Sequence, residues 1–89
     1  MIVKLVNVHD HAQYIEADSI LTQSLANGGI DLECNKRGNE QDRLTRFIIS
    51  EDMEGTGYWK RAYIMENGKT VDTIRATLPP TNKTKRISP

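Results

Sequence analysis

Hydrophobic and polar residues alternate over several short segments of the chain, which is the pattern of strands with one buried face. The clearest case is Ile30–Asn35, where aliphatic residues and Cys34 take every second position. Arg43–Ser50 is predicted to be the next strand. Met1–Val8 is apolar on both faces over most of its length, which is typical of a strand in the middle of a sheet.

The strongest local pattern is a β-hairpin near the end of the chain. Two strand-like runs, Tyr58–Glu66 and Lys69–Leu78, are joined by Asn67-Gly68, a dipeptide that favours the type I′ hairpin turn. Counting outward from this turn places Lys60 directly opposite Arg75. Like charges in that position destabilise a strand pair. The sequence therefore predicts that a bulge breaks the register there, or that an anion sits between the two cations.

The segment His11–Asn27 fits a helix better than a strand. Asp10 is a suitable N-cap, and the glycines after Asn27 supply a helix end. Apolar side chains then share one helical stripe, namely Tyr14, Ala17, Leu21 and Leu25. The alternative is a strand over Tyr14–Thr22, whose buried face would include a serine.

These elements predict an α+β fold, in which one early helix packs on an antiparallel sheet of about five strands. The alternative is a small all-β barrel with the early segment as a sixth strand. The compact domain is expected to span residues 1–78. Residues 79–89 contain three prolines and one aliphatic residue, too little apolar surface to offset the entropy of ordering them. We expect them to form a flexible basic tail.

Composition narrows the class of protein. The 89 residues suit a single domain, and one cysteine allows neither an internal disulfide nor a cysteine-based zinc site. No apolar run is long enough to span a membrane, and the first residues lack the order of a signal peptide, so we expect a cytoplasmic protein. The 12 basic and 12 acidic residues balance, although residues 1–78 are mildly acidic and the tail is basic. This balance argues against a polybasic nucleic-acid binder.

Candidate catalytic and metal-binding residues are few. Cys34 belongs to the alternating series of a strand, which predicts a core side chain rather than a nucleophile. His9 and His11 would share one face of a strand, but the nearby sequence supplies no further ligands for a metal. No set of nucleophile, base and orienting residue is visible. We therefore expect a protein that is not an enzyme and uses no cofactor or metal.

Aromatic and basic residues gather in the hairpin, and more basic residues follow in the tail. Tyrosine, tryptophan and arginine are the residues enriched at protein–protein hot spots, and such residues on a sheet can also bind single-stranded nucleic acid. The alternative for Trp59 and Tyr63 is that their side chains are part of the core. The candidate binding residues are Tyr58, Trp59, Lys60, Arg61, Tyr63, Arg75, Lys83, Lys85 and Arg86.

Small size, balanced charge and the lack of catalytic motifs favour a protein-binding module. We expect it to act stoichiometrically, as an inhibitor, adaptor or decoy of a larger partner, in the manner of small phage and mobile-element proteins. The alternative is a nucleic-acid or nucleotide-binding protein that uses the hairpin and the tail. Two unpaired sheet edges would also suit a homodimer or a partner at one edge.

Overall fold

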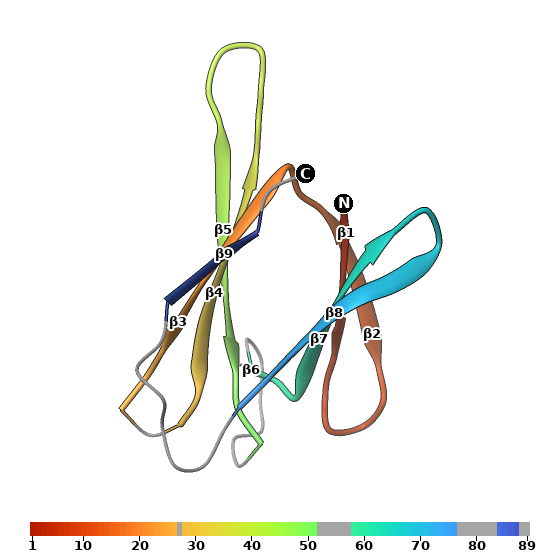
Figure 1. Cartoon of the computed structure of the whole chain (residues 1–89), viewed down its shortest axis with the longest axis vertical. Helices are drawn as coiled ribbons and strands as arrows, with labels where there is room; N and C mark the ends of the chain where they lie inside the picture. Colours follow the sequence, from red (N-terminus) through yellow and green to blue (C-terminus); the bar gives the residue numbers. More distant parts are fainter. Residues whose placement is uncertain (27, 52–57, 77–83, 88–89) are drawn as a thin grey trace.

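The computed structural model describes all residues except 27, 52–57, 77–83 and 88–89, and over these it consists of strands in two sheets that face each other (Figure 1). The four-stranded sheet has the order β2-β1-β7-β8, with bounds Ala12–Glu16, Ile2–Val6, Arg61–Glu66 and Lys69–Arg75. The five-stranded sheet has the order β6-β5-β4-β3-β9, with bounds Tyr58–Trp59, Arg43–Ile49, Ile30–Lys36, Ser19–Ser24 and Thr84–Ile87.

The predicted α+β fold is wrong, because no helix occurs among the residues that the structure describes. The alternative prediction, a small all-β barrel, has the correct all-β class. The described strands form two sheets rather than a barrel. In consequence, no helix in the described part of the chain could cross a membrane. The prediction of a central strand at the start of the chain is confirmed, since β1 lies between β2 and β7.

The core lies between the two sheets and is built from alternate residues of their strands. Burial of these side chains is the main force that holds the sheets together. Partly buried apolar side chains, Trp59 and Ile87 among them, pack against its margin. The buried apolar residues are Val3, Leu5, Ala17, Ile20, Leu32, Cys34, Ile49, Ala62, Ile64 and Ile74.

The segment predicted to be a helix forms β2 and β3 instead. Ile15 packs against the core from one sheet, and Ile20 and Thr22 are buried in the other. The chain crosses between the sheets at Ala17 and Asp18, so the alternation of buried residues shifts by one position there. The helical stripe suggested by the sequence does not form, since Ala17 is its one buried member and Tyr14 is 60% exposed. Long-range burial therefore overrides the local helical pattern.

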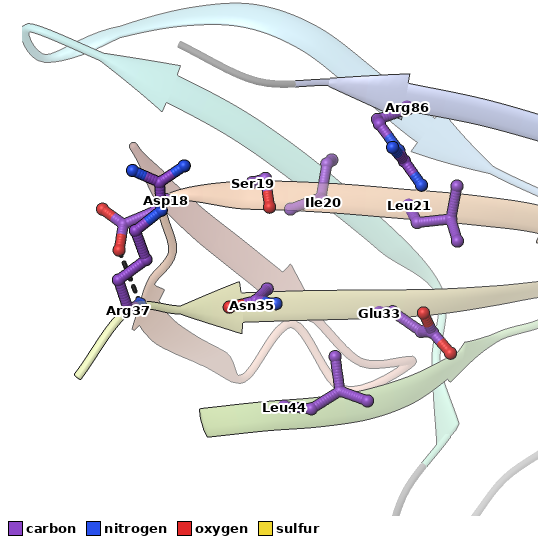
Figure 2. A pocket seen from close by; sticks show the side chains of 9 residues that line it. All are labelled: Asp18, Ser19, Ile20, Leu21, Glu33, Asn35, Arg37, Leu44 and Arg86. Carbon is purple, nitrogen blue, oxygen red and sulfur yellow. Dashed lines mark hydrogen bonds between the residues drawn. The ribbon is translucent and has the colours of Figure 1, made fainter. Parts of the chain in front are cut away.

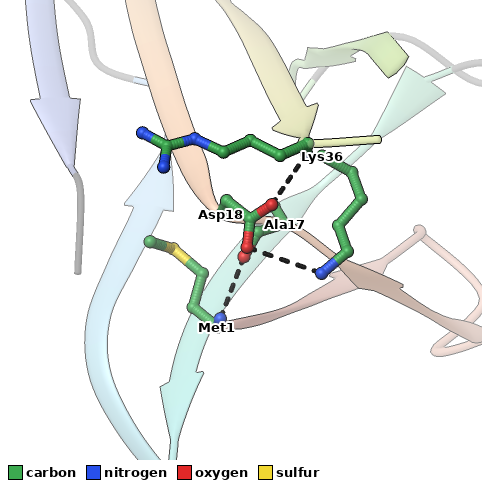
Figure 3. A network of polar contacts seen from close by, with 5 residues as sticks. Met1, Ala17, Asp18 and Lys36 are labelled. Atoms are coloured by element: carbon green, nitrogen blue, oxygen red, sulfur yellow. Dashed lines mark hydrogen bonds and ion pairs between the residues drawn. The ribbon is translucent and has the colours of Figure 1, made fainter. Parts of the chain in front are cut away.

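Hydrogen bonds fix this crossing (Figure 3). The Met1 amino group donates to the Ala17 carbonyl at 2.9 Å, and the Ala17 amide donates to the Met1 carbonyl at 3.0 Å. The Asp18 carboxylate accepts from the Arg37 amide at 2.7 Å and from Lys36 Nζ at 3.4 Å. The hydrogen bond from the Arg37 backbone amide lowers the pKa of Asp18 below its usual 3.8, and the positive charges of Lys36 and Arg37 add to this effect.

Replacing Asp18 with asparagine is expected to reduce the acid sensitivity of the fold. A carboxyl group with a lowered folded-state pKa contributes stability above its unfolded pKa, and loses that contribution as pH falls through the folded value. Urea unfolding between about pH 5 and pH 2 should therefore show a shallower loss of stability in Asp18→Asn than in wild type. Glu40→Gln, an exposed position, serves as the control. Parallel pH profiles for wild type and Asp18→Asn would contradict the role given to this carboxylate.

The predicted hairpin is confirmed, but its register changes part of the way along. Asn67 and Gly68 both have positive φ, 52° and 77°, as a type I′ turn requires. The pairs Glu66–Lys69 and Met65–Thr70 form as expected, and then a bulge beside Ile64 shifts every later pair. Ala62 faces Ile74 and Arg61 faces Arg75, so Lys60 does not lie opposite Arg75. Of the two alternatives that the sequence offered, the structure has the bulge, and it lies closer to the turn than Lys60.

The run Tyr58–Glu66 is not the single strand that the sequence predicts. It divides at Lys60 into β6, which pairs with β5, and β7, which pairs with β1. The Ser50 amide donates to the Trp59 carbonyl and the Lys60 amide donates to the Val6 carbonyl, both at 2.8 Å. Consecutive residues are thus anchored to different sheets, and the chain passes between the two layers within one residue.

Part of the predicted flexible tail is ordered. Thr84–Ile87 forms β9, which pairs antiparallel with β3, while residues 79–83 and 88–89 lie outside the described part. Ile87 lies opposite Ile20 and packs against the core. The expectation of flexibility is therefore corrected for these four residues, because the backbone ladder and one aliphatic side chain give the segment a place in the sheet.

Replacing Ile87 with serine is expected to destabilise the fold by about 1 kcal/mol, because it removes apolar contact from a half-buried position. In a domain of this size that corresponds to a fall in melting temperature of about 5 °C. Arg86→Ser is the matched control, since Arg86 is exposed on the other side of the same strand. Thermal unfolding followed by circular dichroism compares the two variants. Equal melting temperatures would show that β9 does not stabilise the sandwich.

Candidate functional site

The two sheets separate the candidate binding residues of the hairpin. Trp59 packs against the core, and Tyr58 lies beside Ile48 on the outer side of the five-stranded sheet. Lys60 lies at the passage between the sheets. Arg61, Tyr63 and Arg75 remain together on the outer side of the four-stranded sheet.

The basic residues near the end of the chain are also separated from that surface. Lys83 lies outside the described residues, and the structure describes Lys85 only as a backbone position in β9. Arg86 is exposed opposite Leu21, on the outer side of the five-stranded sheet. The structure therefore places Arg86 on a different sheet from Arg61 and Arg75.

A row of side chains crosses the outer side of the four-stranded sheet. Lys4 of β1 lies directly opposite Tyr14 of β2 on one side and Tyr63 of β7 on the other. The Lys4 Nζ atom is 5.9 Å from the centre of the Tyr14 ring and 6.0 Å from that of Tyr63. Both distances suit a cation–π interaction. Tyr14 is 60% exposed, so the row presents aromatic surface to solvent.

Two arginines lie next to this row. Arg61 and Arg75 face each other across β7 and β8, and Arg61 also lies opposite Val6. A hydrogen bond with the Tyr63 side chain, followed by the charges of Tyr63, Glu51 and Asp10, raises the pKa of Arg61 further above its usual value. We call the surface formed by Lys4, Tyr14, Arg61, Tyr63 and Arg75 the tyrosine–cation face.

The tyrosine–cation face contains a shallow groove of about 350 Å³. Apolar residues of three neighbouring strands form part of its wall, and Asp10 lines it from the β1–β2 turn. Asp10 has a positive φ of 62°, and its turn is held by the Asn7 side chain, which accepts from two backbone amides. The lining residues are Lys4, Val6, Asp10, Ala12, Tyr63, Met65 and Thr70.

A second pocket, of about 500 Å³, lies on the outer side of the five-stranded sheet (Figure 2). Figure 2 shows Asp18 and Arg37 at one end of β3 and β4, with Leu44 on β5 and Arg86 on β9 beside the pocket. Its acidic side chains are already engaged, because Asp18 accepts from the Arg37 amide and Glu33 is paired with Arg46. Its acidic side chains are therefore already occupied, while the side chains of Arg37 and Arg86 also line it.

Sequence reasoning missed Lys4 and Tyr14, which complete the tyrosine–cation face. The predicted helix placed Tyr14 on a buried stripe, whereas the strand turns it outward. The polar position of Lys4 within an apolar strand was the one available signal, since a lysine there indicates an outward-facing side. Neither residue could be joined to Tyr63 without knowing that β1 lies between β2 and β7.

The structure also places the residues considered for catalysis or metal binding. Cys34 is buried in the core, as predicted, and burial raises its thiol pKa to about 11. The rings of His9 and His11 lie 6.3 Å apart around the β1–β2 turn. Within the part of the chain that is described, no group of three or more His, Cys, Asp or Glu side chains could hold a metal ion.

No family model, curated protein or solved structure matches the chain. The interpretation of the tyrosine–cation face therefore depends on its geometry and chemistry.

Proposed function

We propose that the chain is a small, non-enzymatic protein-binding module that binds a larger partner stoichiometrically through the tyrosine–cation face. Acting this way, it would serve as an inhibitor, adaptor or decoy of that partner. The main support is the row formed by Tyr14, Lys4 and Tyr63 on the outer side of the sheet. Tyrosines provide large contact areas at a low entropic cost, and arginines beside them are typical of interface hot spots.

The sheet beneath this surface supports the proposal further. Val3, Leu5, Ala62 and Ile64 lie on its inner side and are fully buried, so the strands that carry the outer side chains are fixed by the core. Surfaces presented on well-packed strands are more precise than surfaces on loops. The tyrosine–cation face can therefore meet a partner with little rearrangement of its backbone.

A second candidate is binding of single-stranded nucleic acid, favoured by the mixture of aromatic and basic side chains on one sheet face. The position of Lys4 argues against it, because the Lys4 ammonium group lies near both tyrosine rings, where a base would have to stack. Asp10 and Glu51 also lie near the cations and would repel phosphates. Protein binding is therefore the better supported function.

Affinity capture with the full chain as bait distinguishes the two candidates. We expect a discrete protein to be retained in a fixed ratio to the bait, to remain after nuclease treatment, and to form a complex whose mass by light scattering matches that ratio. We also expect the chain to leave a single-stranded DNA column at low salt, since few phosphates would be contacted. Nuclease-sensitive capture together with strong, salt-dependent DNA retention would favour the nucleic-acid function instead.

A further inference from the structure

We propose that Arg61 and Arg75 form a site for a carboxylate of the protein partner, and that Glu51 occupies this site in the free chain. This inference rests on the proposed function, because it assigns a partner chemistry to one part of the tyrosine–cation face. The partner segment that enters the site is acidic, and it displaces a side chain of the module itself.

The opposition of the two arginines is the first observation. Arg61 and Arg75 are directly opposite in the β7–β8 ladder, where like charges destabilise the pair. The bulge beside Ile64 creates this pairing, because an unbroken register would place Lys60 opposite Arg75. A small domain has a thin margin of stability. An anion between the two guanidinium groups would turn this unfavourable contact into a favourable one.

The described residues neutralise these charges only in part. Glu51 Oε1 lies 3.9 Å from Arg75 Nη2, which is the outer limit of an ion pair and too long for a hydrogen bond. Both side chains are largely exposed, so the pair contributes little. Arg61 Nε is shielded from solvent and has no hydrogen-bond partner among the residues described. Among the described residues, the carboxylate paired with these guanidinium groups is that of Glu51, and Asp10 has a weaker influence on Arg61.

The surroundings orient the site for a ligand. Tyr63 lies two positions from Arg61 along β7 and on the same outer side of the sheet, so its ring borders the site. Val6 and Ala12 lie in the same row of the sheet and give the site an apolar side. An apolar surface lowers the local dielectric constant and strengthens the attraction of an anion that covers it. Arginine can also hold a carboxylate through two parallel hydrogen bonds.

Charge complementarity favours a carboxylate over a chain of phosphates. Asp10 lies close enough to influence Arg61, and residues 1–78 carry nine basic and twelve acidic residues in total. A polyanion would meet these acids along its length, whereas one or two carboxylates would contact only the arginines. The chemistry therefore fits an acidic peptide segment, whose apolar side chains could contact the tyrosines beside the site.

Replacing Glu51 tests the proposal through the direction in which the affinity for a carboxylate changes. If Glu51 competes with the partner's carboxylate, replacing it with glutamine removes the competitor and strengthens binding. The expected gain is about two- to fivefold, the range of an exposed ion pair. A purely structural role for Glu51 would give no gain.

The test uses the full chain labelled with ¹⁵N and titrated with a capped tetrapeptide that contains two adjacent glutamates, followed by NMR. Arg61→Gln/Arg75→Gln is expected to bind the peptide at least about tenfold more weakly than wild type. Arg37→Gln/Arg43→Gln is the matched control for the arginine variant, because both positions are exposed near the far end of the β4–β5 hairpin and the net charge also changes by two units. Glu40→Gln, exposed in the same region, is the control for Glu51→Gln. The spectrum of each variant also reports whether it is folded.

The inference requires that the chemical-shift changes cluster on β7 and β8, and that Glu51→Gln binds the peptide more tightly than Glu40→Gln. It also requires that the arginine variant binds the peptide more weakly than Arg37→Gln/Arg43→Gln. Equal effects in variants and controls would overturn it, since only net charge would then matter. If inorganic phosphate or a thymidine hexanucleotide binds more tightly than the glutamate peptide, the assignment of a carboxylate as the ligand is overturned. If a captured partner depends on Tyr14 and Tyr63 but not on the arginines, this inference fails while the proposed function stands.

Discussion

Replacing Trp59 with alanine is expected to lower the free energy of unfolding by about 3 kcal/mol, at the lower end of the range for aromatic core truncations. Trp59 pairs with the fully buried Ile49 and packs against the core. Its loss opens a void at the margin of the core, beside the passage to β7. For a domain of this size, the melting temperature should fall by about 15 °C. Urea and thermal unfolding measured by circular dichroism provide the values.

Tyr58→Ala is the control for this prediction. Tyr58 precedes Trp59 in β6, but its side chain lies beside Ile48 on the outer side of the sheet. We expect it to cost much less stability than Trp59→Ala. A Trp59→Ala variant that unfolds like wild type yet fails to bind the partner would contradict the core position, and would make Trp59 an exposed anchor.

Replacing Tyr63 with alanine is expected to weaken partner binding by about 2 kcal/mol, or roughly thirtyfold in Kd, while the chain stays folded. Tyr63 lies at the centre of the tyrosine–cation face, where it contacts Lys4 and interacts with Arg61. Its truncation removes aromatic contact area and also releases both cations. The stability should change by less than about 1 kcal/mol, since the side chain lies on the outer side of the sheet.

Calorimetric titration of the captured partner with wild type and Tyr63→Ala measures this effect. Leu44→Ala is the matched control, because Leu44 is 56% exposed on the outer side of the other sheet. It should bind like wild type. If Leu44→Ala weakens binding and Tyr63→Ala does not, the partner uses the five-stranded sheet.

Local patterns predicted those strands whose residues alternate without interruption. Ile30–Asn35 lies within β4, and Asn67-Gly68 forms the hairpin turn. The errors arise where the chain changes sheet or register. The segment predicted to be a helix holds two short strands of different sheets, joined at Ala17 and Asp18. The division of a run at Lys60 depends on partners far away in the sequence, so no local pattern could show it.

The candidate site was predicted in part, for the same reasons. Arg61, Tyr63 and Arg75 stay together because the hairpin that holds them is local. Lys4 and Tyr14 join them only through the long-range order β2-β1-β7. The sequence placed Lys60 opposite Arg75 or else a bulge in the hairpin, and the bulge brings Arg61 opposite Arg75 instead.

Hydroxyl-radical footprinting of the module in complex with its captured partner tests the central claim most directly, because it reports the solvent exposure of individual side chains. Tyr14 and Tyr63 lie on the tyrosine–cation face, and Tyr58 lies on the outer side of the opposite sheet. The proposed function predicts that Tyr14 and Tyr63 become protected from oxidation on binding, while Tyr58 reacts as it does in the free chain. Protection of Tyr58 with unchanged oxidation of Tyr14 and Tyr63 would contradict it.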